Sequence, residues 1–315
     1  MTDRVPFAPR SVPTFYFVGV TTGQSSIMKV FPKWMDVIGL DVEIAGIDAP
    51  LHAPAETYRA IVEHIKTDPM VRGALVTTHK IDLLQATRDL FDYLDPNAQL
   101  ADEISCIAKH SGRLEGFAKD PISSGKAWEA FVPSSHFGQT EAQVLCFGSG
   151  GAAVATSMYL ASRPNQADRP HKFILVDINQ GRLDHARAIH AQMHTDLPFA
   201  YVLNRAPVHN DALLSALPEG SVVVNATGMG KDIPGSPISD EAVFPMHGLV
   251  WEMNYRGELN FLRQARRQTE ARQLRLEDGW VYFLHGWTQV IAEVFQIDLT
   301  AELFAELDRV AQPFR

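Results

Sequence analysis

The sequence has few cysteines, no long apolar run and a deficit of positive charge, and each absence excludes a class of protein. Two cysteines, Cys106 and Cys146, cannot build a disulfide framework and lack the CxxC spacing of a zinc site, so we expect a reducing, cytoplasmic setting. No apolar stretch approaches the roughly 20 residues of a bilayer span, and the first residues lack a signal-peptide core, so we expect no membrane partner. With 28 basic against 37 acidic residues the net charge is −9, which disfavours a nucleic-acid partner.

The composition and the order of elements predict a two-domain α/β protein. A chain of 315 residues is long for one core, and 46% hydrophobic with 21% charged residues is typical of a globular protein. Strand-like segments alternate with helix-like ones, which predicts mostly parallel sheets. The first half contains expected strands at 14–20, 42–47 and 74–77, expected helices at 27–37 and 56–66, and a hairpin turning at 110–112. We expect the stretch PISSG at 121–125 to break this pattern.

A second alternation begins at Gln143. Its expected strands lie at 144–147, 172–176, 200–203, 222–225 and 249–252, and its expected helices at 152–161 and 182–193. We therefore expect residues 1–124 to form a substrate-binding domain and residues 125–280 to form a Rossmann-type dinucleotide-binding domain. The helical tail, 281–315, should return to the first domain.

A glycine-rich turn, Gly148-Ser149-Gly150-Gly151, connects a predicted strand to a predicted helix. Glycines allow a tight turn, and backbone N–H groups at the start of a helix can bind a pyrophosphate. A glycine-rich turn alone is weak evidence, but the strand before it and the helix after it supply the context that a dinucleotide site requires. With Ala152, this turn is the predicted phosphate-binding segment, and an ordinary strand-to-helix loop is the alternative.

Asp177 ends the next predicted strand and is the predicted contact to the ribose of the coenzyme. A carboxylate there accepts hydrogen bonds from both ribose hydroxyls and repels a 2′-phosphate, and Ile178 adds no positive charge. The coenzyme should therefore be NAD rather than NADP. The sequence separation between Gly148 and Asp177 exceeds the usual interval of about 20 residues. The polar loop 163–171 accounts for the extra residues. A helix-capping aspartate is the alternative.

His190 and His194 have the spacing of two metal ligands on a helix. That helix follows the strand of Asp177 and should lie on the outer flank of the sheet, so we interpret the two histidines as an incidental surface pair. We expect no metal site. The Gly230-Lys231 pair is followed by Asp232 and so does not form a P-loop.

Lys80 and Asp120 are the candidate proton-transfer pair. Lys80 ends the segment VTTHK after one predicted strand, and Asp120 ends GRLEGFAKD after another. Ligands of open α/β sheets bind beyond the carboxyl ends of the strands, so both side chains should face a nicotinamide. The alternative for each residue taken alone is a solvated surface charge.

Together these segments resemble the shikimate dehydrogenase family, including its quinate/shikimate branch that uses NAD. The resemblance covers nearly the whole chain and is carried by VTTHK at 76–80, DEISC at 102–106, GRLEGFAKD at 112–120, the glycine turn, NATGMG at 225–230 and WEMNY at 251–255. The family's Asn-Arg-Thr segment, whose arginine serves NADP, is replaced here by Asp177-Ile178-Asn179.

The resemblance implies an oxidoreductase of aromatic amino acid biosynthesis that moves a hydride between a nicotinamide and a ring carbinol of a cyclic hydroxy acid. Lys80 would exchange the hydroxyl proton, and Asp120 would orient Lys80 and hold the substrate hydroxyl. The implied substrate contacts are Ser25, Thr77, Ser105, Tyr255, His285 (Leu284 after a one-residue shift) and Gln289. The implied coenzyme contacts beyond the glycine turn and Asp177 are Asn225, Ala226, Thr227 and Gly230. The expected partners are a small-molecule substrate and, in a homodimer, a second copy.

The predicted substrate contacts depart from the family pattern at several positions. The proline of the family's Val-Thr-x-Pro-x-Lys block is missing, and Ile27 stands where the second serine of its carboxylate-binding Ser-x-Ser pair belongs. Ser105 and Ala118 replace two asparagines, and His285 replaces a glutamine. A pocket built on hydrogen bonds discriminates strongly when one partner is lost, so the preferred substrate should not be shikimate itself.

Two other functions stay open. Methylene-tetrahydrofolate dehydrogenases resemble this two-domain arrangement and also use a lysine. The GRLEG block and the segment at Asn225 favour the shikimate dehydrogenases instead. A non-catalytic NAD-binding sensor on the same fold would have no need of Lys80 and Asp120.

Overall fold

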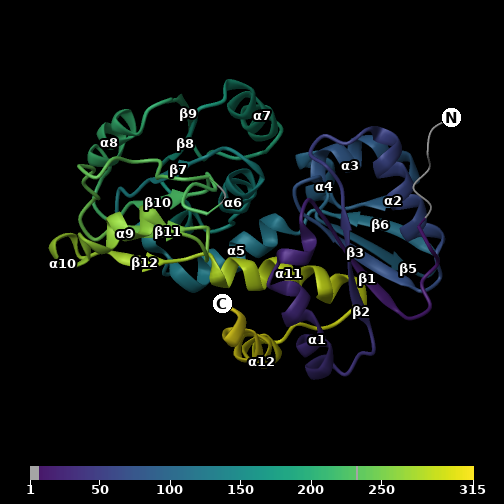
Figure 1. The fold of residues 1–315 in the computed structure, drawn as a ribbon. Coiled ribbons are helices and arrows are strands. Elements are labelled where there is room, and N and C mark those ends of the chain that lie inside the picture. The colour runs from purple at the N-terminus through teal and green to yellow at the C-terminus, as the bar shows by residue number, and fades with distance from the viewer. Residues whose placement is uncertain (1–6, 232) are drawn as a thin grey trace. The chain divides into compact units, whose positions relative to one another are not determined.

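The computed structural model describes residues 7–231 and 233–315, which form two compact units, each with its own six-stranded sheet (Figure 1). The first unit comprises the chain up to Lys119 and Gly286–Arg315, and the second comprises Asp120–His285. The expected boundaries, after residues 124 and 280, differ from these by a few residues. The predicted class, α/β with two mostly parallel sheets, is confirmed. No helix in the described ranges has the length and apolar character needed to cross a bilayer.

The sheet of the first unit has the strand order β2-β1-β3-β5-β6-β4. Its strands are β1 (Thr14–Gly19), β2 (Glu43–Asp48), β3 (Val71–Val76), β4 (Tyr93–Leu94), β5 (Cys106–His110) and β6 (Arg113–Phe117). β1 pairs in parallel with β2 and β3, whereas β5 is antiparallel to both β3 and β6. The carboxyl ends of β1, β3 and β6 therefore share one edge of the sheet with the start of β5.

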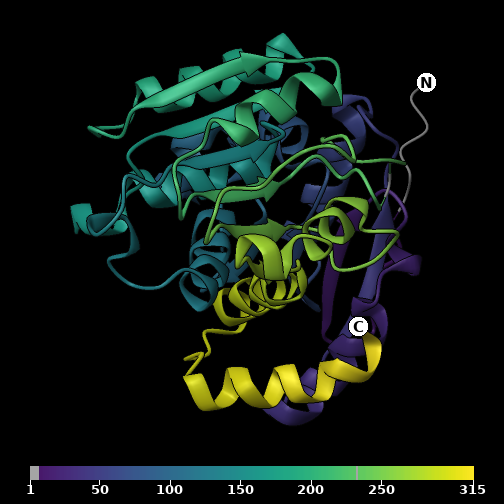
Figure 2. The ribbon, with the colours of Figure 1, turned by 90° about the vertical axis from the view of Figure 1, so that its left-hand side faces the viewer.

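Helices cover both faces of this sheet. They are α1 (Ile27–Ile38), α2 (Ala55–Thr67), α3 (Lys80–Thr87), α4 (Pro96–Ala101), the part of α11 (Trp280–Phe295) from Gly286 onward, and α12 (Ala301–Ala311). Tyr16 and Val18 pack into the core beneath α2, while Phe15 and Phe17 contact rings of α1 and α11 on the opposite face. Figure 2 shows α12 beside α1, where the Trp34 indole donates to the carbonyl of Leu307 at 2.7 Å.

The sheet of the second unit is entirely parallel, with the strand order β12-β11-β10-β7-β8-β9. Its strands are β7 (Val144–Phe147), β8 (Phe173–Asp177), β9 (Phe199–Leu203), β10 (Val222–Asn225), β11 (Leu249–Glu252) and β12 (Arg275–Glu277). Counted from β7 as strand 1, this is the 3-2-1-4-5-6 order of the Rossmann fold. The order reverses between β7 and β10, and such a switch point is where dinucleotides bind.

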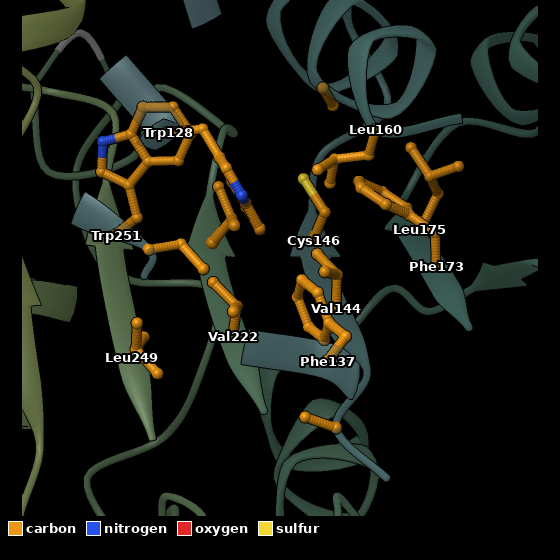
Figure 3. Close-up of a cluster of buried hydrophobic side chains, with 14 of the residues drawn as sticks. Trp128, Phe137, Val144, Cys146, Leu160, Phe173, Leu175, Val222, Leu249 and Trp251 are labelled. Atoms are coloured by element: carbon orange, nitrogen blue, oxygen red, sulfur yellow. The ribbon is translucent and has the colours of Figure 1, made fainter. Parts of the chain in front are cut away.

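The helices of the second unit are α5 (Asp120–Phe131), α6 (Gly151–Ala161), α7 (Gln180–Ala191), α8 (Pro207–Ser215), α9 (Asn260–Arg266) and α10 (Thr269–Arg272). Short 3₁₀ turns in the two units lie at Thr22–Gln24, Arg88–Leu90, His136–Gly138, Gln166–Asp168 and Gln312–Phe314. Figure 3 shows the hydrophobic core on one face of the sheet, which includes Trp128 of α5 and Trp251 of β11. A second core around Phe147 and Phe261 lies on the other face, so the central strands are buried on both sides.

One expectation about local structure is wrong. Residues 121–125 do not break the pattern, because they form the first turns of α5, where Pro121 costs no helical hydrogen bond. The helices expected in the C-terminal tail are α11 and α12, and the chain leaves the helical conformation between them.

Candidate active site

Backbone hydrogen bonds join the strand ends at one edge of the first sheet. Thr77 N–H donates to Val18 at 3.0 Å, Val76 N–H donates to Ser105 at 2.9 Å, and Ser105 N–H donates to Phe117 at 3.0 Å. Lys80 begins α3 immediately beyond β3, and its N–H donates to Thr77 at 3.2 Å. Thr77, Lys80 and Ser105, three of the predicted site residues, therefore lie along the edge at which α/β sheets bind ligands.

The predicted substrate contacts on this edge differ in how much polar surface they offer. Ser25 and Thr77 are half-buried, whereas Ser105 is buried and its Oγ accepts the N–H of Lys119 at 2.8 Å. Ile27 and Ala118 are both 0% exposed. The two positions where the family has polar side chains are thus parts of the hydrophobic core here.

His79, next to Lys80, is a buried residue for which the sequence predicts no role. Its Nδ1 lies 3.1 Å from the Tyr58 hydroxyl of α2, and that hydroxyl also accepts the N–H of Ala53 at 3.2 Å. Which of these two atoms donates depends on the tautomer of the ring, whose other nitrogen is Nε2. This Nε2 has no hydrogen-bond partner in the described part of the chain.

Lys119 was also missed, although it lies between Ala118 and Asp120. Its ammonium forms an ion pair with Glu293 of α11 and lies 4.8 Å from the centre of the Phe117 ring. The Lys119 side chain is only 11% exposed. No local sequence pattern predicts this ion pair, because Glu293 is far away in the sequence.

The remaining predicted catalytic and substrate residues are divided between the units. Asp120 begins α5 in the second unit and is buried, as is His285, whereas Gln289 is half-buried on the part of α11 in the first unit. Burial, with the nearby charge of Lys126, lowers the pKa of His285 to about 4, so its ring is neutral at neutral pH. The convergence of Lys80 with Asp120 stays a prediction.

Tyr255 follows β11 in the second unit. It is half-buried, and its ring lies 5.4 Å from that of Trp280 and 4.8 Å from that of Phe283. These contacts fix the plane of the phenol ring, and its contact with a substrate stays a prediction.

The glycine turn joins β7 to α6 as predicted. Gly148 has φ +94°, and a Cβ built there would lie 2.7 Å from the carbonyl oxygen of Ala226. At Gly150 a Cβ would meet nothing within 4 Å, and α6 begins at the next residue. Gly148 is thus required by the fold, whereas Gly150 leaves open space where a pyrophosphate could approach the helix N-terminus.

Asp177 ends β8 as predicted, and its carboxylate binds the glycine turn directly. Oδ2 accepts the N–H of Ser149 at 2.8 Å and its hydroxyl at 2.9 Å, while Oδ1 accepts the N–H of Asn179 at 2.9 Å. The helix-capping alternative is wrong, because Asn179 caps α7 through its own side chain. Ile178 is 68% exposed beside it.

The predicted segment at Asn225 is held by a buried carboxylate. Asn225 Nδ2 donates to Glu252 at 2.7 Å, and its Oδ1 accepts the N–H and the hydroxyl of Thr227 at 3.2 and 2.6 Å. Burial raises the pKa of Glu252 to about 7. Ala226 lies against Gly148, so this segment and the glycine turn form one packed unit.

The interpretation of His190 as a surface residue is wrong. The ring is 5% exposed, lies 2.7 Å from the Ser157 hydroxyl and 2.8 Å from the Tyr201 hydroxyl, and stacks on Phe199. Burial lowers its pKa to about 4. His190 is therefore a structural residue of the α6–α7 layer.

Comparison with known proteins shows what the chain is similar to. No protein-family model matches the chain. The curated relatives include the shikimate dehydrogenase (NADP(+)) of Streptococcus gordonii, which is 27% identical over 68% of this chain and 69% of its own length. The shikimate dehydrogenase (NADP(+)) of Streptococcus thermophilus is 28% identical over 71% of this chain and 73% of its own length.

Solved structures share the fold at low identity. Quinate dehydrogenase from Corynebacterium glutamicum in complex with NAD has a TM-score of 0.75 and 17% identity, over 96% of this chain and 99% of its own. Shikimate 5-dehydrogenase from Thermus thermophilus in complex with NADP(H) and shikimate has a TM-score of 0.66 and 20% identity, over 95% and 99%. The 5-ketofructose reductase of a Gluconobacter species has a TM-score of 0.70 and 17% identity, over 95% and 98%.

The chain thus has the fold of two-domain dehydrogenases, with a Rossmann-type unit joined to a second α/β unit. Within that class it is a distant relative of the shikimate dehydrogenases, and the resemblance predicted from its motifs is confirmed.

Proposed function

We propose that the chain is an NAD-dependent oxidoreductase of shikimate/quinate dehydrogenase type, which transfers a hydride between nicotinamide and a ring carbinol of a cyclic hydroxy acid. The observation that carries the proposal is the carboxylate of Asp177, which ends β8 and is bound to the glycine turn through Ser149. A carboxylate at this place in a Rossmann fold suits a ribose hydroxyl and repels a 2′-phosphate. The curated relatives are named as NADP(+) enzymes, so use of NAD would set this chain apart from them.

The second unit offers the groups that a dinucleotide needs. Gly150 leaves space above the N-terminus of α6, where free N–H groups and the helix dipole favour a pyrophosphate. Ile178, exposed beside Asp177, offers an apolar surface and no cation. These residues fit NAD.

The proposed proton chemistry uses the edge of the first sheet. NAD, when bound, supplies the hydride acceptor for alcohol oxidation. Lys80 takes the hydroxyl proton during oxidation and returns it during reduction, and Asp120 orients the lysine and the substrate hydroxyl. Lys80 suits this work because it begins a helix at the ligand-binding edge of the sheet.

The proposed substrate is a cyclic hydroxy acid other than shikimate. Ile27 and Ala118 are fully buried, so they offer no hydrogen bonds where the family has polar contacts. A substrate that lacked the matching polar groups would lose nothing there, whereas shikimate would leave groups unpaired. We place this activity in the cytoplasm, since both cysteines are free and buried.

The test is turnover of a panel containing shikimate, quinate and their deoxy and amino analogues, each with NAD and with NADP. The expected result is reduction of NAD with an analogue in preference to shikimate. Lys80→Ala should lower turnover about 100-fold or more while the NAD dissociation constant stays within twofold. The matched control is Lys33→Ala, at a lysine 59% exposed on α1, which should change neither.

The coenzyme assignment is tested separately. Ile178→Arg adds a cation at an exposed position and should raise the use of NADP relative to NAD at least tenfold. Equal or better use of NADP by the unaltered chain would overturn the role of Asp177. Unchanged turnover in Lys80→Ala would remove Lys80 from the mechanism.

A further inference from the structure

Glu252 is a buried carboxyl group that no step of the proposed reaction uses. It ends β11 and is 0% exposed. Its Oε2 accepts Asn225 Nδ2 at 2.7 Å, and its Oε1 accepts the Asn254 N–H at 2.9 Å and Asn254 Nδ2 at 2.6 Å. All three contacts come from N–H donors of two asparagines, an arrangement that suits the ionised carboxylate, which accepts through both oxygens.

The two asparagines transmit this arrangement to the segment Ala226–Gly230. Asn225 Oδ1 accepts the N–H and hydroxyl of Thr227, and the Thr227 hydroxyl in turn accepts the Met229 N–H at 3.1 Å. Asn254 Nδ2 also lies 3.3 Å from the carbonyl oxygen of Met229. The segment is therefore fixed at two points by groups that Glu252 orients.

The same segment is packed against the glycine turn. The Ala226 carbonyl lies so close to Gly148 that a Cβ there would be 2.7 Å from its oxygen and 2.8 Å from its carbon. The Ala226 N–H donates to Phe147 at 2.8 Å, at the residue before the turn. A shift of the segment would therefore displace the backbone that faces a bound coenzyme.

We propose that Glu252 is a positioning residue for the coenzyme, whose ionised carboxylate holds Asn225, Asn254 and the segment Ala226–Gly230 against the glycine turn. This inference rests on the proposed dinucleotide function. Protonation of Glu252 places an O–H against a ring of donors, removes one acceptor and loosens the segment.

The charge state of Glu252 changes within the accessible pH range. Burial raises its pKa to about 7, and the negative charge of Asp278, which follows β12, acts in the same direction. The amides of Asn225 and Asn254 act in the opposite direction. Glu252 is therefore ionised above pH 7 and takes up a proton as the pH falls below it.

The experiment is calorimetric titration of the full chain with NAD between pH 6 and pH 8.5. If only the ionised form positions the segment, NAD should bind about tenfold more weakly at pH 6 than at pH 8. Glu252→Gln should bind NAD about tenfold more weakly at pH 8, with no further loss at pH 6. Glu252→Asp keeps the carboxylate and should keep the pH dependence. The control, Glu241→Gln, removes an exposed carboxylate of the same unit and should behave as the unaltered chain.

The outcomes separate the two proposals. If neither NAD nor NADP binds the unaltered chain at any pH, the proposed function is wrong and this inference falls with it. If NAD binds with equal affinity at pH 6 and pH 8, or if Glu252→Gln keeps the affinity and the pH profile of the unaltered chain, only the inference is overturned. The pH profile of the unaltered chain needs no variant, so it decides the matter even where Glu252→Gln does not fold.

Discussion

Gly148 and Gly150 lie two residues apart in one turn, yet alanine should affect them in opposite ways. Gly148 has φ +94°, a conformation that costs an L-residue roughly 1–2 kcal/mol. Its added Cβ would also lie 2.7 Å from a backbone oxygen of Ala226, which cannot rotate away. Relieving such overpacking typically costs about 1–3 kcal/mol. Gly148→Ala should therefore lower the free energy of unfolding by about 2–5 kcal/mol.

Gly150→Ala is the matched control for stability and the sharper test of function. Gly150 has an ordinary φ of −77°, and a Cβ there meets nothing within 4 Å. The only expected cost in stability is that alanine is a poorer N-cap residue than glycine, which is worth about 1 kcal/mol or less. The same methyl group would occupy the space assigned to the pyrophosphate. Gly150→Ala should thus fold normally and bind NAD at least tenfold more weakly.

Urea unfolding and NAD titration measure the two effects independently. The reasoning predicts a large loss of stability for Gly148→Ala and a loss of affinity without a comparable loss of stability for Gly150→Ala. Wild-type stability in Gly148→Ala would refute the packing of the turn on Ala226. NAD affinity within twofold of wild type in Gly150→Ala would refute the placement of the pyrophosphate.

Two further predictions concern buried charge. Glu293→Gln leaves the Lys119 ammonium, which is 11% exposed, without its counter-ion and should lower the free energy of unfolding by about 3–5 kcal/mol. Lys119→Met leaves the Glu293 carboxylate without its counter-ion, and because that side chain is 25% exposed the loss should be smaller. The double variant should cost less than the sum of the two, and additive costs by chemical denaturation would contradict a direct pair. His190, with its pKa lowered from 6.5 to about 4, contributes stability that is complete above pH 6.5 and is lost as the pH falls toward 4. Between pH 7 and pH 4.5 the unaltered chain should lose about 2.5 kcal/mol more than His190→Gln, and parallel pH profiles would exclude this role.

The sequence was sufficient where a structure depends on neighbours in the chain. β7, β10 and β11 have the predicted bounds, because short apolar runs buried on both faces are read directly from the residues. The glycine turn was equally accessible, since its strand, turn and helix are contiguous. The error at 121–125 has the same origin: proline and glycine suggested a break, although proline is well tolerated in the first turn of a helix.

Buried polar networks were not accessible, because their partners are distant in the chain. The Lys119–Glu293 pair joins the segment after β6 to α11, and the partners of His190 come from α6 and β9. Lys119 lies within the GRLEGFAKD motif, yet its burial could not be predicted. A lysine beside Asp120 is expected to be a solvated surface charge unless its counter-ion is known. Glu252 lies in a motif that resembles the family, but its proposed role depends on Asn225, which lies on the neighbouring strand.

Asp177 shows why position in the fold does not by itself fix the role of a residue. Its place at the end of β8 predicted a ribose contact, but its Oδ2 already accepts two hydrogen bonds from Ser149 and its Oδ1 accepts one from Asn179. A carboxylate has about four acceptor positions, so one is left for a ribose hydroxyl. Replacing Asp177 would therefore change the shape of the glycine turn and the coenzyme contact together, and a loss of NAD binding in such a variant could not be assigned to either. Ile178 is exposed and outside this network, so Ile178→Arg changes the charge beside Asp177 without disturbing the turn and is the cleaner test of the choice between NAD and NADP.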